Sequence, residues 1–120
     1  MQADAALVLF PKFTTVVSDG EHVQSYTSTP LDVSQFGSAQ FQIWRGDLVG
    51  DGSHAPSFKA YLEESTDGER WVLPSGGGSG IDPGKEGTRM LSYAFRLRWF
   101  RVRIDFKGLL ATCWAEGLLR

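Results

Sequence analysis

The chain has 120 residues, a length typical of one domain that can bury a core without disulfides or metals. Apolar residues make up 42% of it and aromatic residues 12%, which excludes an intrinsically disordered chain. A formal net charge of −2 argues against general nucleic-acid binding, which needs a strongly basic surface.

Three features bear on the compartment. The single cysteine, Cys113, cannot form a disulfide within the chain and is typical of a small buried strand residue. No apolar run approaches the roughly 20 residues of a membrane-spanning helix, and the start lacks the basic residues of a signal peptide. We therefore expect a chain that stays in the cytoplasm after synthesis or leaves it in a virion, with no membrane partner.

Strand patterns begin near the N-terminus. The first predicted strand covers residues 6–17 and contains Pro11, so we expect it to break there or to lie at a sheet edge. Residues 1–12 are also expected to serve as an extended arm. The second strand is predicted over residues 22–28, and the third over 38–45, where apolar residues alternate with glutamines.

The middle of the chain predicts a hairpin followed by a loop. Residues 57–64 and 69–73 read as strands on either side of Asp67-Gly68, because glycine accepts the positive φ of a tight turn. Residues 74–87 contain six glycines and are expected to form a flexible loop.

The last strands are predicted over residues 88–97, 99–106 and 110–118. The alternation changes phase near Trp99, which predicts a bulge or bend there. Eight strands without a helix pattern predict one all-β domain over residues 1–120. The expected architecture is a single antiparallel β-sandwich of jelly-roll type.

A group of arginines is the densest charge feature: Arg96, Arg98, Arg101 and Arg103. The planar guanidinium group suits carboxylate or phosphate, so the group is a candidate interface or anion-binding site. Alternatively, these arginines form a solvated sheet face and pair across strands with Glu63, Glu64, Asp67 or Glu69.

Three other motifs bear on binding. Trp44 shares parity with Gln40 and Gln42, so it is predicted to face outward and is a candidate interface aromatic. Residues 45–47 spell the adhesion tripeptide Arg-Gly-Asp, for which a chance match is the simpler explanation. Residues 47–54 contain aspartates and a histidine that could bind calcium, although the glycines there also explain a plain turn.

The sequence contains no Ser-His-Asp set, no phosphate-binding glycine loop before a helix and no His-Glu metal motif. We therefore predict no catalytic residue, no cofactor and no metal.

Two motifs carry a resemblance to a known family: Ser65-Thr66-Asp67-Gly68-Glu69-Arg70-Trp71 and Leu97-Arg98-Trp99-Phe100-Arg101-Val102. Together they resemble the later half of discoidin (F5/8 type C, galactose-binding-like) domains, over about residues 57–104. The resemblance implies a β-sandwich and, as an activity, carbohydrate binding. The chain also resembles small virion-associated proteins of tailed phages and prophages, which coat or decorate capsids and tails.

The leading prediction is a non-enzymatic structural protein that assembles on or within a larger particle, such as a phage or phage-like virion. Its expected partners are further copies of the chain or a capsid or tail protein. The alternative is a carbohydrate-binding module of discoidin type, which predicts exposed aromatic rings and a glycan partner.

Overall fold

The computed structural model describes residues 4–74, 80–84 and 87–120, and in this part of the chain all regular structure is β-strand. The strands are β1 (Ala5–Val17), β2 (Gln24–Thr27), β3 (Leu31–Asp32), β4 (Ser38–Arg45), β5 (Ser57–Ser65), β6 (Thr88–Ala94), β7 (Trp99–Lys107) and β8 (Leu110–Leu119). Within the described ranges no helix is long and apolar enough to cross a bilayer.

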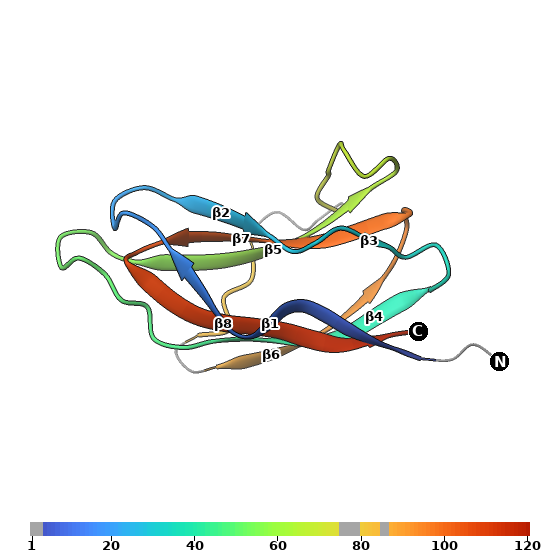
Figure 1. Ribbon diagram of the computed structural model, residues 1–120, viewed down its shortest axis with the longest axis horizontal. Coiled ribbons are helices and arrows are strands. Elements are labelled where there is room, and N and C mark those ends of the chain that lie inside the picture. Colours follow the sequence, from blue (N-terminus) through green and yellow to red (C-terminus); the bar gives the residue numbers. More distant parts are fainter. Residues whose placement is uncertain (1–3, 75–79, 85–86) are drawn as a thin grey trace.

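The strands form two antiparallel sheets that face each other (Figure 1). Sheet A has the order β1-β8-β4-β6 and forms the lower layer of the figure. In sheet B, the upper layer, β7 is central: β5 pairs along one side of it, and β2 and β3 share the other. The all-β antiparallel prediction is confirmed, and the jelly-roll designation stays a prediction.

One hydrophobic core fills the space between the sheets. Alternate residues of each central strand supply it, because successive side chains of a strand point to opposite faces. In β4 these are Ala39, Phe41 and Ile43, all fully buried as the alternation predicts. The ring of Phe41 meets the edge of Phe100 from β7 at 6.4 Å between centroids, which joins the two layers.

The predicted strand over residues 69–73 is wrong. Residues 66–70 form bends, and a single bridge between Glu64 and Val72 is all that remains of the hairpin. The carboxylate of Asp67 accepts the backbone N–H groups of Glu69 and Arg70, both at 2.9 Å. This side chain therefore folds the segment locally, where a hairpin would need ladder bonds. The two-residue strand β3 was not predicted.

The chain crosses between the sheets over residues 95–98. The predicted strand over 88–97 ends at Ala94, and the bend expected near Trp99 is this crossing. The buried carboxylate of Glu64 holds the crossing, since its Oε1 accepts the backbone N–H groups of Arg96 and Leu97 at 2.8 and 2.9 Å.

From Ala5 onward the segment expected as an arm is part of sheet A, where it pairs with β8. Residues 1–3 lie outside the described residues. As Pro11 predicts, β1 is an edge strand, and its register shifts twice between Val8 and Thr14. Of the predicted flexible loop, residues 75–79 and 85–86 lie outside the described residues, whereas Ile81 pairs with β5.

Candidate functional site

Two of the candidate arginines, Arg101 and Arg103, lie on the outer face of sheet B. Between them is Glu63 of β5, whose Oε1 accepts from Nε of Arg101 and whose Oε2 accepts from Nη1 of Arg103, both at 2.8 Å. The side chain of Glu63 points outward, but Glu63 is only 3% exposed because two guanidinium groups cover it. One carboxylate therefore serves two arginines.

Aromatic rings flank both guanidinium groups. Arg101 lies 4.2 Å from the ring centroid of Trp71, and Arg103 lies 4.6 Å from that of Tyr61. Nε of Arg103 also donates to Asp105 at 3.1 Å. This geometry matches the cross-strand pairing that the sequence left open as an alternative. An added anion would have to displace carboxylates already bound.

The other two candidates, Arg96 and Arg98, lie in the crossing between β6 and β7, so the interpretation that all four arginines form one sheet face is wrong for these two. Arg98 binds Asp32 at the end of β3, with Nη2 to Oδ2 at 2.8 Å. This guanidinium holds the pKa of the Asp32 carboxyl well below its usual range. The four arginines are close in sequence, but the structure places two in the crossing and two on β7.

The outer face of sheet A contains the fifth candidate, Trp44. It lies opposite Trp114 of β8 in the register, and the two rings stack at 6.3 Å between centroids with 18° between their planes. Trp44 thus has the outward orientation that its parity predicts. Nζ of Lys12 lies 5.5 Å from the Trp114 ring centroid and 3.9 Å from the carboxylate of Glu116.

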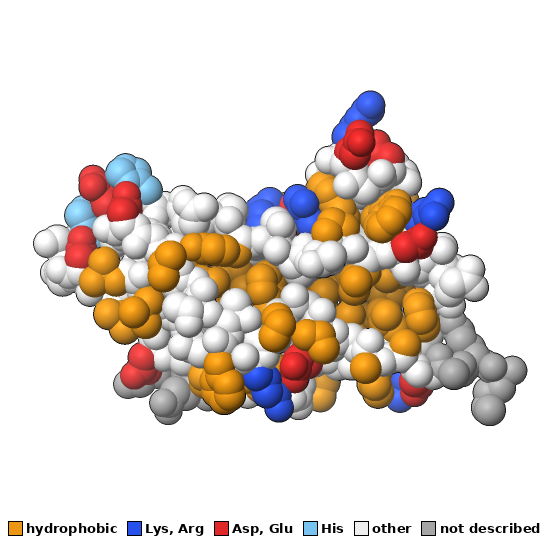
Figure 2. All heavy atoms as spheres, in the orientation of Figure 1, with side chains coloured by type: hydrophobic (Ala, Val, Ile, Leu, Met, Phe, Trp, Pro, Cys, Tyr) orange, Lys and Arg blue, Asp and Glu red, His pale blue; other side chains and the backbone are white. Residues whose placement is uncertain are grey.

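Beside the tryptophans, the same face has a hollow of about 240 Å³. It is lined by Gln40, Phe41, Gln42, Met90, Glu116, Gly117 and Leu118. Large apolar side chains are exposed around it: Val8 is 53% exposed, Met90 64% and Leu118 40%. Figure 2 shows hydrophobic side chains at the surface of the lower layer, next to charged ones.

Sequence reasoning missed Met90 and Leu118. A signal was available, because Leu118 has the same parity as Trp114 and Glu116 on β8, yet it is apolar where a solvated strand carries polar residues. We call this surface the tryptophan face: the outer face of sheet A with Trp44, Trp114, Val8, Met90 and Leu118.

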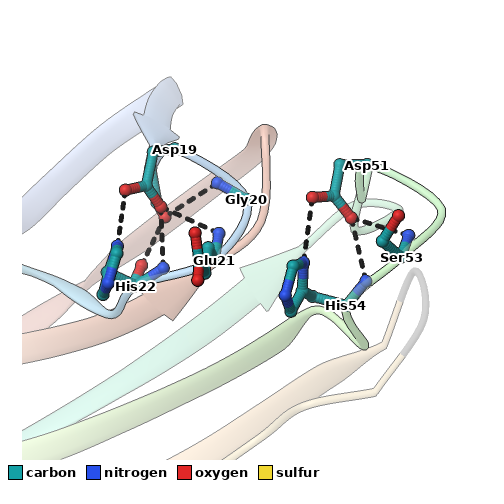
Figure 3. Close-up of polar contacts among 8 residues, drawn as sticks. Asp19, Gly20, Glu21, His22, Asp51, Ser53 and His54 are labelled. Carbon is teal, nitrogen blue, oxygen red and sulfur yellow. Dashed lines mark hydrogen bonds and ion pairs between the residues drawn. The ribbon is translucent and has the colours of Figure 1, made fainter.

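A third cluster lies at one end of the sandwich, where Figure 2 shows both histidines among acidic side chains. Two turns there share the sequence Asp-Gly-x-His, residues 19–22 and 51–54 (Figure 3). In each turn, Oδ1 of the aspartate accepts the backbone N–H groups two and three residues later, at 2.7 to 2.9 Å. Its Oδ2 contacts Nδ1 of the histidine, at 2.7 Å in the first turn and 3.1 Å in the second.

The two turns touch each other, since a Cβ atom on Gly20 would lie 3.1 Å from Oδ2 of Asp51. Their hydrogen bonds lower the pKa of Asp51 to about 2 and raise that of His22 above its ordinary value. No group of three or more histidine, cysteine or acidic residues in the described part of the chain is arranged to hold a metal ion. The calcium interpretation of residues 47–54 is therefore not supported.

Two other sequence features are buried. Arg45, the first residue of the adhesion tripeptide, binds Asp82 through Nε at 2.7 Å and the carbonyl of Gly46 through Nη1 at 3.0 Å. It is therefore not displayed as an adhesion loop would require. Burial raises the pKa of the Cys113 thiol to about 12, which keeps it neutral and unreactive.

No model of a known protein family matches the chain, and no curated protein matches it. The case for a function therefore depends on the surfaces described above, of which the tryptophan face exposes the apolar side chains of Val8, Met90 and Leu118.

Proposed function

We propose that this protein is a non-enzymatic structural protein that assembles on or within a larger particle, and that it docks through the tryptophan face. One observation supports this most: Val8, Met90 and Leu118 expose apolar surface on the side of an antiparallel sheet that faces water. Such a face is normally polar, and large apolar side chains gathered on it among polar ones mark a surface that another molecule covers.

The register shows how this surface is built. One row across the sheet runs Val8, Glu116, Gln42, Met90, and a neighbouring row contains the stacked pair Trp114 and Trp44. The face therefore combines apolar and aromatic anchors with a few polar side chains between them. Protein–protein interfaces have this composition, with aromatic residues and methionine enriched.

A phage or phage-like virion is the particle that the sequence resemblance suggests, with this chain in a decoration or accessory role. The test is incorporation: the chain, carrying a tag, is produced in its native host, and particles are isolated on a density gradient. We expect the wild type in the particle fraction and the Val8→Lys/Leu118→Lys variant outside it.

Val23→Lys is the matched control, because Val23 is also an exposed apolar residue but precedes β2 of sheet B. The control should be incorporated like the wild type. Absence of the wild type from every particle fraction, or equal incorporation of the face variant, would contradict the proposal.

A second candidate function is carbohydrate binding, which one observation favours. The hollow places the side-chain amides of Gln40 and Gln42 and the carboxylate of Glu116 next to the tryptophan pair, and sugars need such hydrogen-bonding groups beside an aromatic ring. The rings are half-buried and stacked on each other, unlike the freely exposed rings that the sequence prediction required. A glycan array would support this candidate if binding disappeared in Gln42→Ala.

A further inference from the structure

A sandwich of two sheets has four edges, and an open edge presents a row of unpaired backbone N–H and C=O groups that another strand can bind. In this protein three edges are obstructed and the fourth, β6, is regular. The regular β6 edge is therefore the one at which a further strand can pair.

The β1 edge is obstructed along its length. Pro11 has no N–H to donate, and Phe13 has a φ of 65°, which kinks the strand at its bulge. Near the end of the strand, the hydroxyl of Tyr26 accepts from the N–H of Val17 at 3.2 Å and donates to its carbonyl at 2.7 Å. A further strand would meet a bulge and occupied backbone groups.

Both edges of sheet B are obstructed as well. On the β5 side, Ile81 makes two backbone hydrogen bonds of 2.8 Å with Ala60, and Val72 makes two of 2.9 and 3.0 Å with Glu64. On the other side, β2 and β3 have four and two residues, and Pro30 lies between them. A strand there would have only short, interrupted partners.

The β6 edge differs from these three. Its seven residues pair with β4 without a register shift, and they contain neither proline nor glycine. Among the described residues, the strand pairs with β4 alone. The N–H of Phe95 donates to the carbonyl of Gly37 at 2.9 Å, so odd-numbered residues direct their backbone groups toward β4. The backbone groups of the even-numbered residues 88 to 94 therefore point to the open edge.

We propose that a second copy of this chain binds at this edge, with β6 antiparallel to β6 about a two-fold axis at Leu91. Backbone parity requires even-numbered residues to bond with even-numbered ones. Centring on Leu91 meets this requirement and overlaps all seven residues, so that Met90 pairs with the partner's Ser92 and Thr88 with the partner's Ala94. The two copies of sheet A then form one continuous sheet.

Charge favours a copy of this strand as the occupant. The only charged side chain on β6 is Arg89, and in this register it lies opposite the uncharged ring of the partner's Tyr93, away from the partner's Arg89. Leu91, half-buried beside the core, meets the partner's Leu91 at a non-hydrogen-bonded position, where side chains approach most closely. The self-complementary contact is what a two-fold dimer needs. This inference does not depend on the proposed function, since it rests on the backbone groups of the β6 edge and not on the exposed side chains of the tryptophan face.

The first test measures the mass of the full chain by sedimentation up to about 1 mM, a range that includes weak dimers. Ser92→Pro removes one open-edge N–H and leaves the β4 ladder intact, whereas Ser92→Ala keeps that N–H. By sedimentation we expect dimers for the wild type and Ser92→Ala and a monomer for Ser92→Pro. Circular dichroism should show that the Ser92→Pro variant is folded. A wild type that is monomeric throughout, or a Ser92→Pro variant that still dimerises, overturns the proposal.

The second test fixes the register by disulfide formation. Leu91→Cys places two thiols on the two-fold axis and should give a covalent dimer under mild oxidation. Arg89→Cys places them about 14 Å apart, beyond the roughly 7 Å between Cα atoms that a disulfide spans. Cys113 is buried and does not compete. Cross-linking of Arg89→Cys but not of Leu91→Cys would overturn the register. A Val8→Lys/Leu118→Lys variant that is lost from particles but still dimerises would show that this interface is separate from the docking face.

Discussion

The hydroxyl of Tyr93, on β6 of sheet A, donates a hydrogen bond to the carboxylate of Glu64, on β5 of sheet B. Glu64 is 2% exposed, and its other oxygen accepts two backbone N–H groups of the crossing between the sheets. Burial, together with the bond to Glu64, raises the pKa of Tyr93 well above its ordinary value. The carboxylate of Glu64 thus joins the two sheets at the crossing.

Replacing Glu64 by alanine should therefore lower the free energy of unfolding by about 3 kcal/mol, because three donors lose their acceptor. Tyr93→Phe removes one of these bonds and should cost about 1 kcal/mol. Urea denaturation measures both, with the exposed Glu69→Ala as control. A Glu64→Ala variant as stable as this control would show that the crossing is held by something else.

In the ion pair of Arg45 and Asp82, the guanidinium side chain is buried at 9% exposure, while the Asp82 side chain is 34% exposed. Asp82→Ala leaves the buried guanidinium without its carboxylate and should destabilise the protein by about 3 kcal/mol. Arg45→Met in the same chain removes the unpaired charge, so the double variant should recover part of that loss. Thermal denaturation of the two single variants and the double variant tests this. Additive losses would contradict it.

Asp67 should make the protein less stable in acid. The backbone N–H groups of Arg70 and Glu69 lower its pKa to about 2, against about 3.9 in an unfolded chain. The stability it contributes is complete above about pH 4 and is lost as the pH falls through about 2. Asp67→Asn keeps the acceptor oxygen but does not titrate. Between pH 4 and pH 2 its free energy of unfolding, measured by urea denaturation, should therefore fall by less than that of the wild type or of Glu69→Gln. An identical loss would contradict the assignment.

His22 should titrate above its ordinary pKa of about 6.5 because its ring bonds the carboxylate of Asp19. The stability from this pair is complete below pH 6.5 and disappears as the pH rises through the raised pKa. Asp19→Asn should bring the titration of His22 back toward 6.5. Proton NMR follows it, with the His54 resonance as internal control. An unchanged titration would mean that Asp19 is not the cause.

Gly117 should tolerate no side chain. A Cβ atom there would lie 2.0 Å from the carbonyl oxygen of Gln40 on the neighbouring strand, so β8 and β4 would have to separate. We expect Gly117→Ala to destabilise the protein by about 3 kcal/mol or more. At Gly37 the nearest atom would be 3.9 Å away, so Gly37→Ala should change stability by less than about 0.5 kcal/mol. Equal melting temperatures for the two variants would contradict this prediction.

The sequence predicts the central strands well because alternation directly reports which face is buried. Residues 38–45 coincide with β4, and three other predicted strands agree with β5, β7 and β8 within a residue or so. Residues 69–73 show the limit of this signal, since the Asp67 side chain binds the backbone groups that a ladder would use. The alternation of apolar and polar residues does not indicate when a side chain will bind the backbone groups in place of a neighbouring strand.

The candidate site was harder to predict because it depends on pairing between distant residues. Trp44 was placed correctly from its parity, but its partner Trp114 lies 70 positions later. Arg98 and Arg101 are three positions apart and bind different carboxylates on different strands. Glu63 lies beneath Arg101 because of the register between β5 and β7, and a short stretch of sequence does not reveal that register.

The pairing of β1 with β8 has a consequence for how the chain can be cut and rejoined. Ala5 lies opposite Leu119, Asp4 and Arg120 form an ion pair of 3.5 Å, and the start of β1 and the end of β8 lie at the same end of the molecule (Figure 1). A short peptide could therefore join these ends, and new ends could be opened in the exposed bends near Glu69. The sandwich is thus suited to circular permutation, with attached tags or cargo moved from the sheet A layer to the sheet B layer at this end of the molecule.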